Sequence, residues 1–211
     1  RNIIALMIFL GLNGCQEVSS PPPNILWITV EDISTNLGCY GDSLAYTPSL
    51  DALASKGFLY NNAIANAPVC APARNAIVTG MYPSSLGTLH MRSFSNAMKS
   101  TGRIPDEVKL YPEVLRKSGY YCTNNTKEDY NFNLKRKIWD ESSKTAHWKN
   151  RPNKSTPFFS IFNLIMTHES CINDKDKHER LTKDLPNHLR TDSSKIVVPP
   201  YFPDTPETRA L

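Results

Sequence analysis

Two short and almost continuously apolar runs constrain the fold of this chain more than any other feature. The first, residues 24–30 (NILWITV), follows three prolines, and the second, residues 158–166 (FFSIFNLIM), lies far downstream. Apolar runs of this length are typical of strands buried on both faces, as in a parallel sheet covered by helices. Helix signals lie between the two runs, so strands alternate with helices. The sequence therefore predicts an α/β fold with a mainly parallel, mixed sheet sandwiched by helices.

The helix signals are pairs of start and stop residues. Thr or Pro is favoured where a helix begins, and Gly is favoured just after its last turn. On this basis we expect helices at residues 48–56 before Gly57, 72–79 before Gly80, and 113–118 before Gly119, with a strand restarting at residues 120–123.

Reactive side chains gather where the predicted strands end. Glu31 and Asp32 follow the first apolar run, and His168 follows the second. In open α/β sheets, ligands bind outside the carboxyl ends of the strands. Cys70 stands where a helix begins. The free amide groups and the dipole at a helix start favour an anion, and they would also activate a thiol. Arg74 lies one turn later on the same helix face as Cys70. These residues predict a site for a tetrahedral oxyanion beside carboxylates suited to a hard metal ion.

The N-terminal segment has the pattern of an export signal. A positive charge precedes the apolar residues 3–12, and the sequence LNGC then ends at Cys15. This pattern is typical of a secretory signal and resembles a bacterial lipobox. We therefore expect residues 1–15 to be a signal peptide, Cys15 to be lipidated, and residues 16–23 to be a linker on an exported lipoprotein of the periplasm or cell surface. A plain signal peptide or a buried first helix are the alternatives.

Charge and hydropathy exclude several classes of partner. The net charge of +4 is spread along the chain, so no nucleic-acid partner is expected. No apolar run reaches the roughly 18 residues of a membrane span, so we expect membrane contact only through a lipid anchor. Cys39, Cys122 and Cys171 leave room for one disulfide, and the sequence does not choose the pair.

The motif around Cys70 resembles a known family. Cys70-x-Pro72-x-Arg74, followed by a helix and Thr79-Gly80, is similar to the signature of type I sulfatases in the alkaline-phosphatase-like superfamily. Further blocks resemble the family in the same order: residues 23–26 with Glu31-Asp32, residues 47–54 with Gly57, residues 119–121 with Lys127, and residues 157–159 with His168. The resemblance implies an alkaline-phosphatase-like fold, of which residues 24–211 would be the incomplete N-terminal portion of the catalytic domain. The chain starts at Arg1 and begins a helix at Thr205-Pro206, so we expect a fragment.

The resemblance also implies a chemistry. The family hydrolyses sulfuric esters, here of a sulfated polysaccharide or glycosaminoglycan, through a formylglycine that a separate formylglycine-generating enzyme makes from the cysteine, and through one divalent ion, usually Ca²⁺. The residues carried over are Cys70, Arg74, Lys127 and His168 as catalytic, Glu31, Asp32 and Cys70 as metal ligands, and His90, Lys127 and His168 as substrate-binding.

Several departures keep alternatives open. Glu31 stands where the family usually has Asp, and Glu128-Asp129 stands where Trp-His often follows the lysine. The later metal ligands are expected beyond Leu211, so the fragment alone is expected to be inactive. The alternatives are a phosphomonoester or phosphodiester hydrolase of the same superfamily, and a non-catalytic binder of sulfated glycans.

Overall fold

The computed structural model describes residues 20–91, 104–132 and 136–209. The predicted signal segment at residues 1–15, with Cys15, and the first half of the linker at residues 16–23 lie outside the described residues. No helix within the described ranges is both long enough and apolar enough to cross a membrane.

A parallel sheet forms the centre of the fold. Its strands are β1 (Ile25–Val30), β2 (Tyr121–Asn125), β3 (Glu141–Ser142) and β4 (Phe158–Leu164). They are arranged in the order β1-β4-β2-β3, and every pair is parallel. Val30 lies opposite Leu164 and Asn125 lies opposite Phe162, so three strands end at the same edge. The predicted α/β architecture with a mainly parallel sheet is confirmed.

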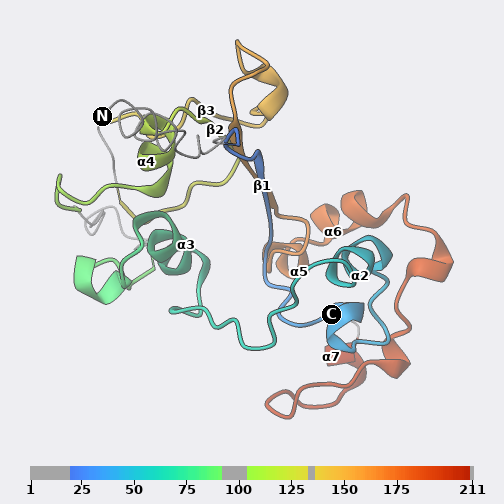
Figure 1. The fold of residues 1–211 in the computed structure, drawn as a ribbon. Helices are drawn as coiled ribbons and strands as arrows, with labels where there is room; N and C mark the ends of the chain where they lie inside the picture. The colour runs from blue at the N-terminus through green and yellow to red at the C-terminus, as the bar shows by residue number, and fades with distance from the viewer. Residues whose placement is uncertain (1–19, 92–103, 133–135, 210–211) are drawn as a thin grey trace, which may run out of the picture.

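Helices connect the strands as the start and stop residues indicate. They are α2 (Pro48–Ala54), α3 (Cys70–Thr79), α4 (Tyr111–Lys117), α5 (Ser170–Asn173), α6 (Lys175–Thr182) and α7 (Pro206–Arg209), with single 3-10 turns at η1 (Gly38–Tyr40), η2 (Pro83–Leu86), η4 (Trp148–Asn150), η5 (Asn187–Leu189) and η6 (Ser193–Lys195). α3 begins at Cys70, two residues earlier than predicted, and ends at Thr79, which is followed by Gly80 with a left-handed φ of 67° that suits glycine. In Figure 1, α3 and α4 lie together, apart from α2, α5 and α6.

The hydrophobic core lies between the sheet and the α3–α4 side. Phe159 and Ile161, which alternate along β4, pack with Val78 of α3 and Trp139. Tyr111 of α4 contacts the Phe159 ring edge-on at 5.2 Å between ring centroids. None of the cysteines in the described ranges, namely Cys39, Cys70, Cys122 and Cys171, forms a disulfide. Burial in the core raises the pKa of Cys122 to about 12, which makes this thiol inert.

One expectation about the sheet is wrong for β1. The apolar run was expected to be buried on both faces, but Leu26 and Ile28 are 51% and 50% exposed. These side chains are exposed because β1 pairs with β4 alone and forms the edge of the sheet in the described part of the chain. Its neighbour β4 shows the expected burial, with four of its seven residues buried.

The start of α4 carries a stability prediction. Glu113 accepts hydrogen bonds from the Leu110 amide at 2.9 Å and from Arg136 Nε at 2.7 Å. Although burial alone would raise the pKa of Glu113, the hydrogen bonds from Arg136 and the Leu110 amide lower it below its ordinary value. We expect Glu113→Ala to lower the free energy of unfolding by about 1–2 kcal/mol at pH 7, because a helix cap and an ion pair are lost together.

The sign of the pH dependence follows from the lowered pKa. A carboxylate with a lowered folded-state pKa stabilises the fold above the ordinary Glu pKa of about 4.3, and this stabilisation is lost as pH falls through the folded value. The difference between Glu113→Ala and the parent should therefore shrink below about pH 4 in urea unfolding curves. The exposed Glu107 provides the control, and Glu107→Ala should stay within about 0.5 kcal/mol of the parent. An equal loss of unfolding free energy in Glu113→Ala and Glu107→Ala would contradict a stabilising role for the Glu113 cap and ion pair.

Candidate active site

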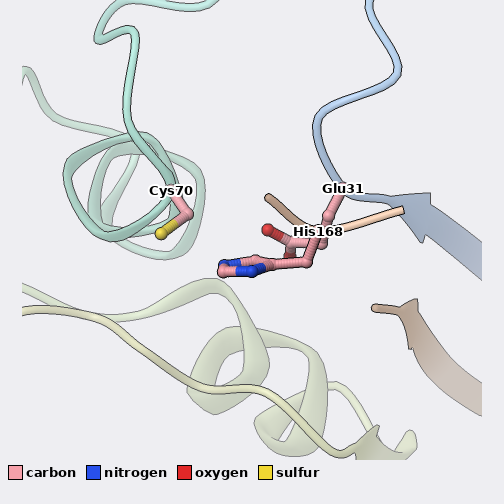
Figure 2. Close-up of side chains that lie close together, drawn as sticks. All are labelled: Glu31, Cys70 and His168. Carbon is pink, nitrogen blue, oxygen red and sulfur yellow. The ribbon is translucent and has the colours of Figure 1, made fainter. Parts of the chain in front are cut away.

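The predicted site residues converge at the carboxyl edge of the sheet. Glu31 follows β1, Lys127 follows β2, His168 follows β4, and Cys70 opens α3. Figure 2 shows the side chains of Glu31, Cys70 and His168 close together, and their ligand atoms all lie within 4.8 Å of each other. Parallel strands explain the convergence, since their carboxyl ends meet at one edge although the residues are far apart in sequence.

Cys70 lies at the first position of a ten-residue helix. The residue before it, Val69, makes no side-chain cap, so the amides of Cys70 and Ala71 have no partner within the helix start and can favour an anion. The expected activation of the thiol is wrong, however, because the pKa of Cys70 is raised. Burial is the largest cause of the raised pKa. The positive charge of Lys127 acts in the opposite direction and lowers the pKa. The Asp129 carboxylate accepts a hydrogen bond from Sγ at 3.4 Å and raises the pKa further. The helix start thus holds a protonated thiol.

Glu31 is a buried carboxylate held by two cations. Its side chain is 6% exposed, Arg74 Nη2 lies 2.5 Å from Oε1, and Lys127 Nζ lies 3.0 Å from Oε2. Burial alone would raise the pKa of Glu31, but the hydrogen bonds and charges of Arg74 and Lys127 outweigh burial and lower it. Glu31 is therefore charged at neutral pH, and its negative charge positions both cations.

Arg74 connects α3 to the sheet through a residue that the sequence analysis missed. Its Nη1 donates to Asn163 Oδ1 at 2.9 Å and to the Lys127 carbonyl at 3.2 Å. Asn163 lies on β4 and in turn donates to Asn124 Oδ1 at 2.9 Å. The sequence offered one indication of this role for Asn163, which is the amide side chain inside the apolar run of residues 158–164. A buried polar side chain requires hydrogen-bond partners, so an amide in such a run indicates bonds to other polar groups.

Asp129 is a second residue that the sequence analysis did not place in the site. Its carboxylate contacts Cys70 and lies 3.7 Å from Lys127 Nζ, with a side-chain exposure of 5%. The preceding residue points elsewhere, since Glu128 Oε1 accepts a hydrogen bond from Ser142 Oγ at 2.5 Å. Glu128 and Asp129 stand where the resemblance leads one to expect Trp-His, and the second of these residues places a carboxylate against Cys70.

His168 has a defined orientation. Its Nδ1 accepts a hydrogen bond from the Ser170 amide at 3.2 Å and lies 3.0 Å from Ser170 Oγ. A ring nitrogen that accepts from a backbone amide carries no proton, so the neutral ring carries its proton on Nε2. His168 can therefore donate a hydrogen bond from Nε2.

The donor atoms fit a hard divalent ion in type. Glu31 and Asp32 supply carboxylate oxygens, the ligands that Ca²⁺ prefers. Both residues line one cavity of about 500 Å³ together with Cys70 and Arg74. Asp32 is fixed by its backbone, with a φ of 52°, and by its Oδ2, which accepts from the Glu169 amide at 3.0 Å. Sulfur is a soft ligand, so Cys70 would fit this ion only after an oxygen replaced its sulfur.

His90 does not line the cavity that contains Cys70, Glu31 and Asp32. It is exposed, it follows η2, and its carbonyl oxygen accepts a hydrogen bond from Asn131 Nδ2. Its role toward substrate stays a prediction.

Comparison with known proteins gives consistent similarities. The sequence profile of the family described as Sulfatase matches residues 23–196. An ulvan-active sulfatase of Formosa agariphila is 40% identical over 87% of this chain and 36% of its own length. The N-acetylgalactosamine-6-sulfatase of Homo sapiens is 36% identical over 53% of this chain and 22% of its own length.

The fold is also similar to solved structures. A putative sulfatase from Bacteroides thetaiotaomicron superposes with a TM-score of 0.58, at 23% identity, over 71% of this chain and 36% of that protein. The chain thus spans about a third of the length of the Formosa relative and of this structural neighbour.

Proposed function

The chain belongs to the sulfatase family, and from this premise we propose that it is part of a sulfuric ester hydrolase that acts on sulfated carbohydrates. One observation carries the proposal. Cys70, at an uncapped helix start, lies within reach of the buried Glu31 and of His168, and Arg74 of the same motif is paired with Glu31 at 2.5 Å. The helix start and Arg74 favour an anion beside Cys70, and Glu31 offers a carboxylate to a metal ion.

We propose that Cys70 is converted to formylglycine by a formylglycine-generating enzyme. The pKa of the Cys70 thiol is raised by burial, and a protonated thiol is a poor nucleophile, so the unmodified side chain is unsuited to attack a sulfate ester. The hydrated aldehyde supplies one hydroxyl to attack the sulfate ester and a second to eject sulfate afterwards. Conversion also puts oxygen beside Glu31 and Asp32, which suits the hard ion described above.

The remaining side chains have roles that follow from their contacts. Arg74 and Lys127 hold positive charge beside Cys70 and stabilise the negative charge of a sulfate group. His168 presents a proton on Nε2, and we propose that it donates to the sulfate or to the departing alcohol oxygen. Ca²⁺, held by Glu31, Asp32 and position 70, would neutralise charge on the sulfate oxygens when bound.

The substrate class rests on the relatives. The Formosa protein is named for ulvan and the human one for N-acetylgalactosamine 6-sulfate. We propose a sulfated polysaccharide or glycosaminoglycan as the substrate of this chain. Export to the periplasm or cell surface, with a lipid anchor on Cys15, agrees with a polymeric substrate outside the cell. The match of the Sulfatase profile begins at residue 23, the last residue of the proposed linker, and this supports a domain that starts at about residue 24.

Mass spectrometry and turnover test the proposed function together. The protein is expressed at the full length of its gene, with and without the converting enzyme, and the peptide containing Cys70 is analysed. Conversion should lower the peptide mass by about 18 Da, because a thiol is replaced by an aldehyde. The converted protein should release inorganic sulfate from ulvan, chondroitin sulfate or heparan sulfate, and it should turn over an aryl sulfate faster than the matching aryl phosphate. An unmodified thiol in an active protein, or a preference for the phosphate, would refute the proposal.

A further inference from the structure

The ring of His168 lies at one end of a chain of hydrogen bonds that leads from the candidate active site to α6. The Ser170 hydroxyl lies 3.0 Å from His168 Nδ1, and Lys177 Nζ donates to the same hydroxyl oxygen. All three residues are half-buried. We infer that Ser170 and Lys177 are positioning residues that hold the ring proton of His168 on Nε2. This inference rests on the proposed function, in which Nε2 serves the substrate.

The backbone on both sides of His168 is fixed by the end of β1. Thr167 Oγ1 donates to the Glu31 carbonyl, and the Glu169 amide donates to Asp32 Oδ2 at 3.0 Å. These two bonds set the point from which the His168 side chain starts. They set neither the rotation of its ring nor the nitrogen that carries the proton. Contacts of the ring itself are needed for both.

The direction of each hydrogen bond in the chain follows from its two ends. A lysine ammonium can only donate, so the Ser170 oxygen accepts from Lys177. The Ser170 amide donates to His168 Nδ1 at 3.2 Å, so Nδ1 is an acceptor. The Ser170 hydroxyl therefore also gives its hydrogen to Nδ1. Two donors on Nδ1 leave no place for a proton there, and Nε2 is the nitrogen that remains for the site.

Lys177 strengthens the bond that Ser170 makes to the ring. A hydroxyl whose oxygen accepts from a cation is polarised, so it is a better donor than the same hydroxyl alone. The start of α6 holds Lys177 in place, because Asp174 caps this helix and its Oδ1 accepts from the Lys177 amide at 2.9 Å. Lys175 lies in the same turn but is exposed. The two lysines therefore form a matched pair for experiment.

The position of the ring proton can be measured without turnover. The protein is made at the full length of its gene with ¹⁵N-labelled histidine, and the signals that are absent from His168→Gln belong to this ring. At neutral pH, the ¹H–¹⁵N spectrum of the parent should show the proton on Nε2. Ser170→Ala should show a mixture of the two tautomers, and Lys177→Met should move toward the same mixture. A proton on Nε2 alone in Ser170→Ala would overturn the inference.

Turnover separates positioning from direct contact with the substrate. Sulfate release from the polysaccharide that the parent hydrolyses should fall about 10–10²-fold in Ser170→Ala, a part of what an acid–base group contributes. Lys177→Met should lower it about 10-fold, and Lys177→Arg, which keeps a cationic donor, should recover most of this loss. Adding Lys177→Met to Ser170→Ala should cause no further loss, because Lys177 acts through the hydroxyl. Lys175→Met is the control and should keep the parental rate.

Several results would overturn the inference. A further loss in the double variant would show that Lys177 acts on the substrate itself, and an equal loss in Lys175→Met would show a general effect of charge on α6. Parental turnover in Ser170→Ala would remove its role. If Ser170→Ala does not fold, the two Lys177 variants decide, and a rate in Lys177→Arg no higher than in Lys177→Met overturns the inference. A parent without formylglycine or turnover would instead refute the proposed function, while the ring spectra would still locate the proton.

Discussion

Cys70→Ser should lower the turnover of sulfated substrate by on the order of 10⁵-fold, the loss expected when a catalytic nucleophile is removed. Serine at the start of α3 keeps the size of the side chain and the helix position, but its single hydroxyl cannot both hold sulfate and expel it. The measurement is inorganic sulfate release from the polysaccharide that the parent hydrolyses, with both proteins expressed beside the converting enzyme.

The matched control for this variant is another cysteine in the described part of the chain. Cys39 lies in η1, is partly buried and forms no disulfide. Cys39→Ser should keep the parental rate within about twofold, since it removes only a sulfur atom away from the site. Comparable rates for the parent and Cys70→Ser would show that the reaction does not pass through position 70.

Arg74→Met is expected to lower both stability and activity. Removing the guanidinium leaves Glu31, 6% exposed, with one of its two cations and leaves Asn163 Oδ1 without its bond from Nη1. Breaking a buried ion pair from one side costs about 3 kcal/mol, because the remaining charge stays buried. Activity should fall about 10³-fold, because a fixed positive charge beside the sulfate is lost. Urea unfolding and sulfate release measure the two effects.

Two further variants separate the loss of stability from the loss of activity and test whether the effect is specific to Arg74. Adding Glu31→Gln to Arg74→Met should recover part of the lost stability, since the buried charge is then removed, and should recover none of the activity. Arg116→Met tests an arginine whose pair with Asp140 is more exposed, at 30% and 24%, and should cost no more than about 1 kcal/mol. Equal destabilisation by Arg74→Met and Arg116→Met would contradict a special role for the pair between Arg74 and Glu31.

The sequence predicted the parts of the fold that depend on local pattern. The apolar runs and the glycines at residues 80 and 119 located β1, β4 and the ends of two helices to within a few residues. Parallel strands then required that Glu31 and His168 meet at one edge. The exposure of β1 was not predictable, because it depends on which strand lies beside it in the sheet.

The details of the site depended on three-dimensional contacts. The start of α3 predicted an activated thiol, but burial and the carboxylate of Asp129, 59 residues away, reverse the shift in pKa. Asp129 and Asn163 were missed for the same reason. The role of a lone Asp in a polar segment, or of a lone Asn in a strand, depends on the side chains that it contacts, and the sequence does not show these contacts.

The order of strands also governs when this domain can form during synthesis. Thr29 of β1 and Asn163 of β4 are hydrogen-bonded neighbours separated by 134 positions. A ribosome must therefore release nearly the whole of this segment before the first strand finds its partner. Until then the backbone hydrogen-bonding groups of β1 have no partner strand, and a stalled or prematurely ended translation product would expose this apolar strand to other chains.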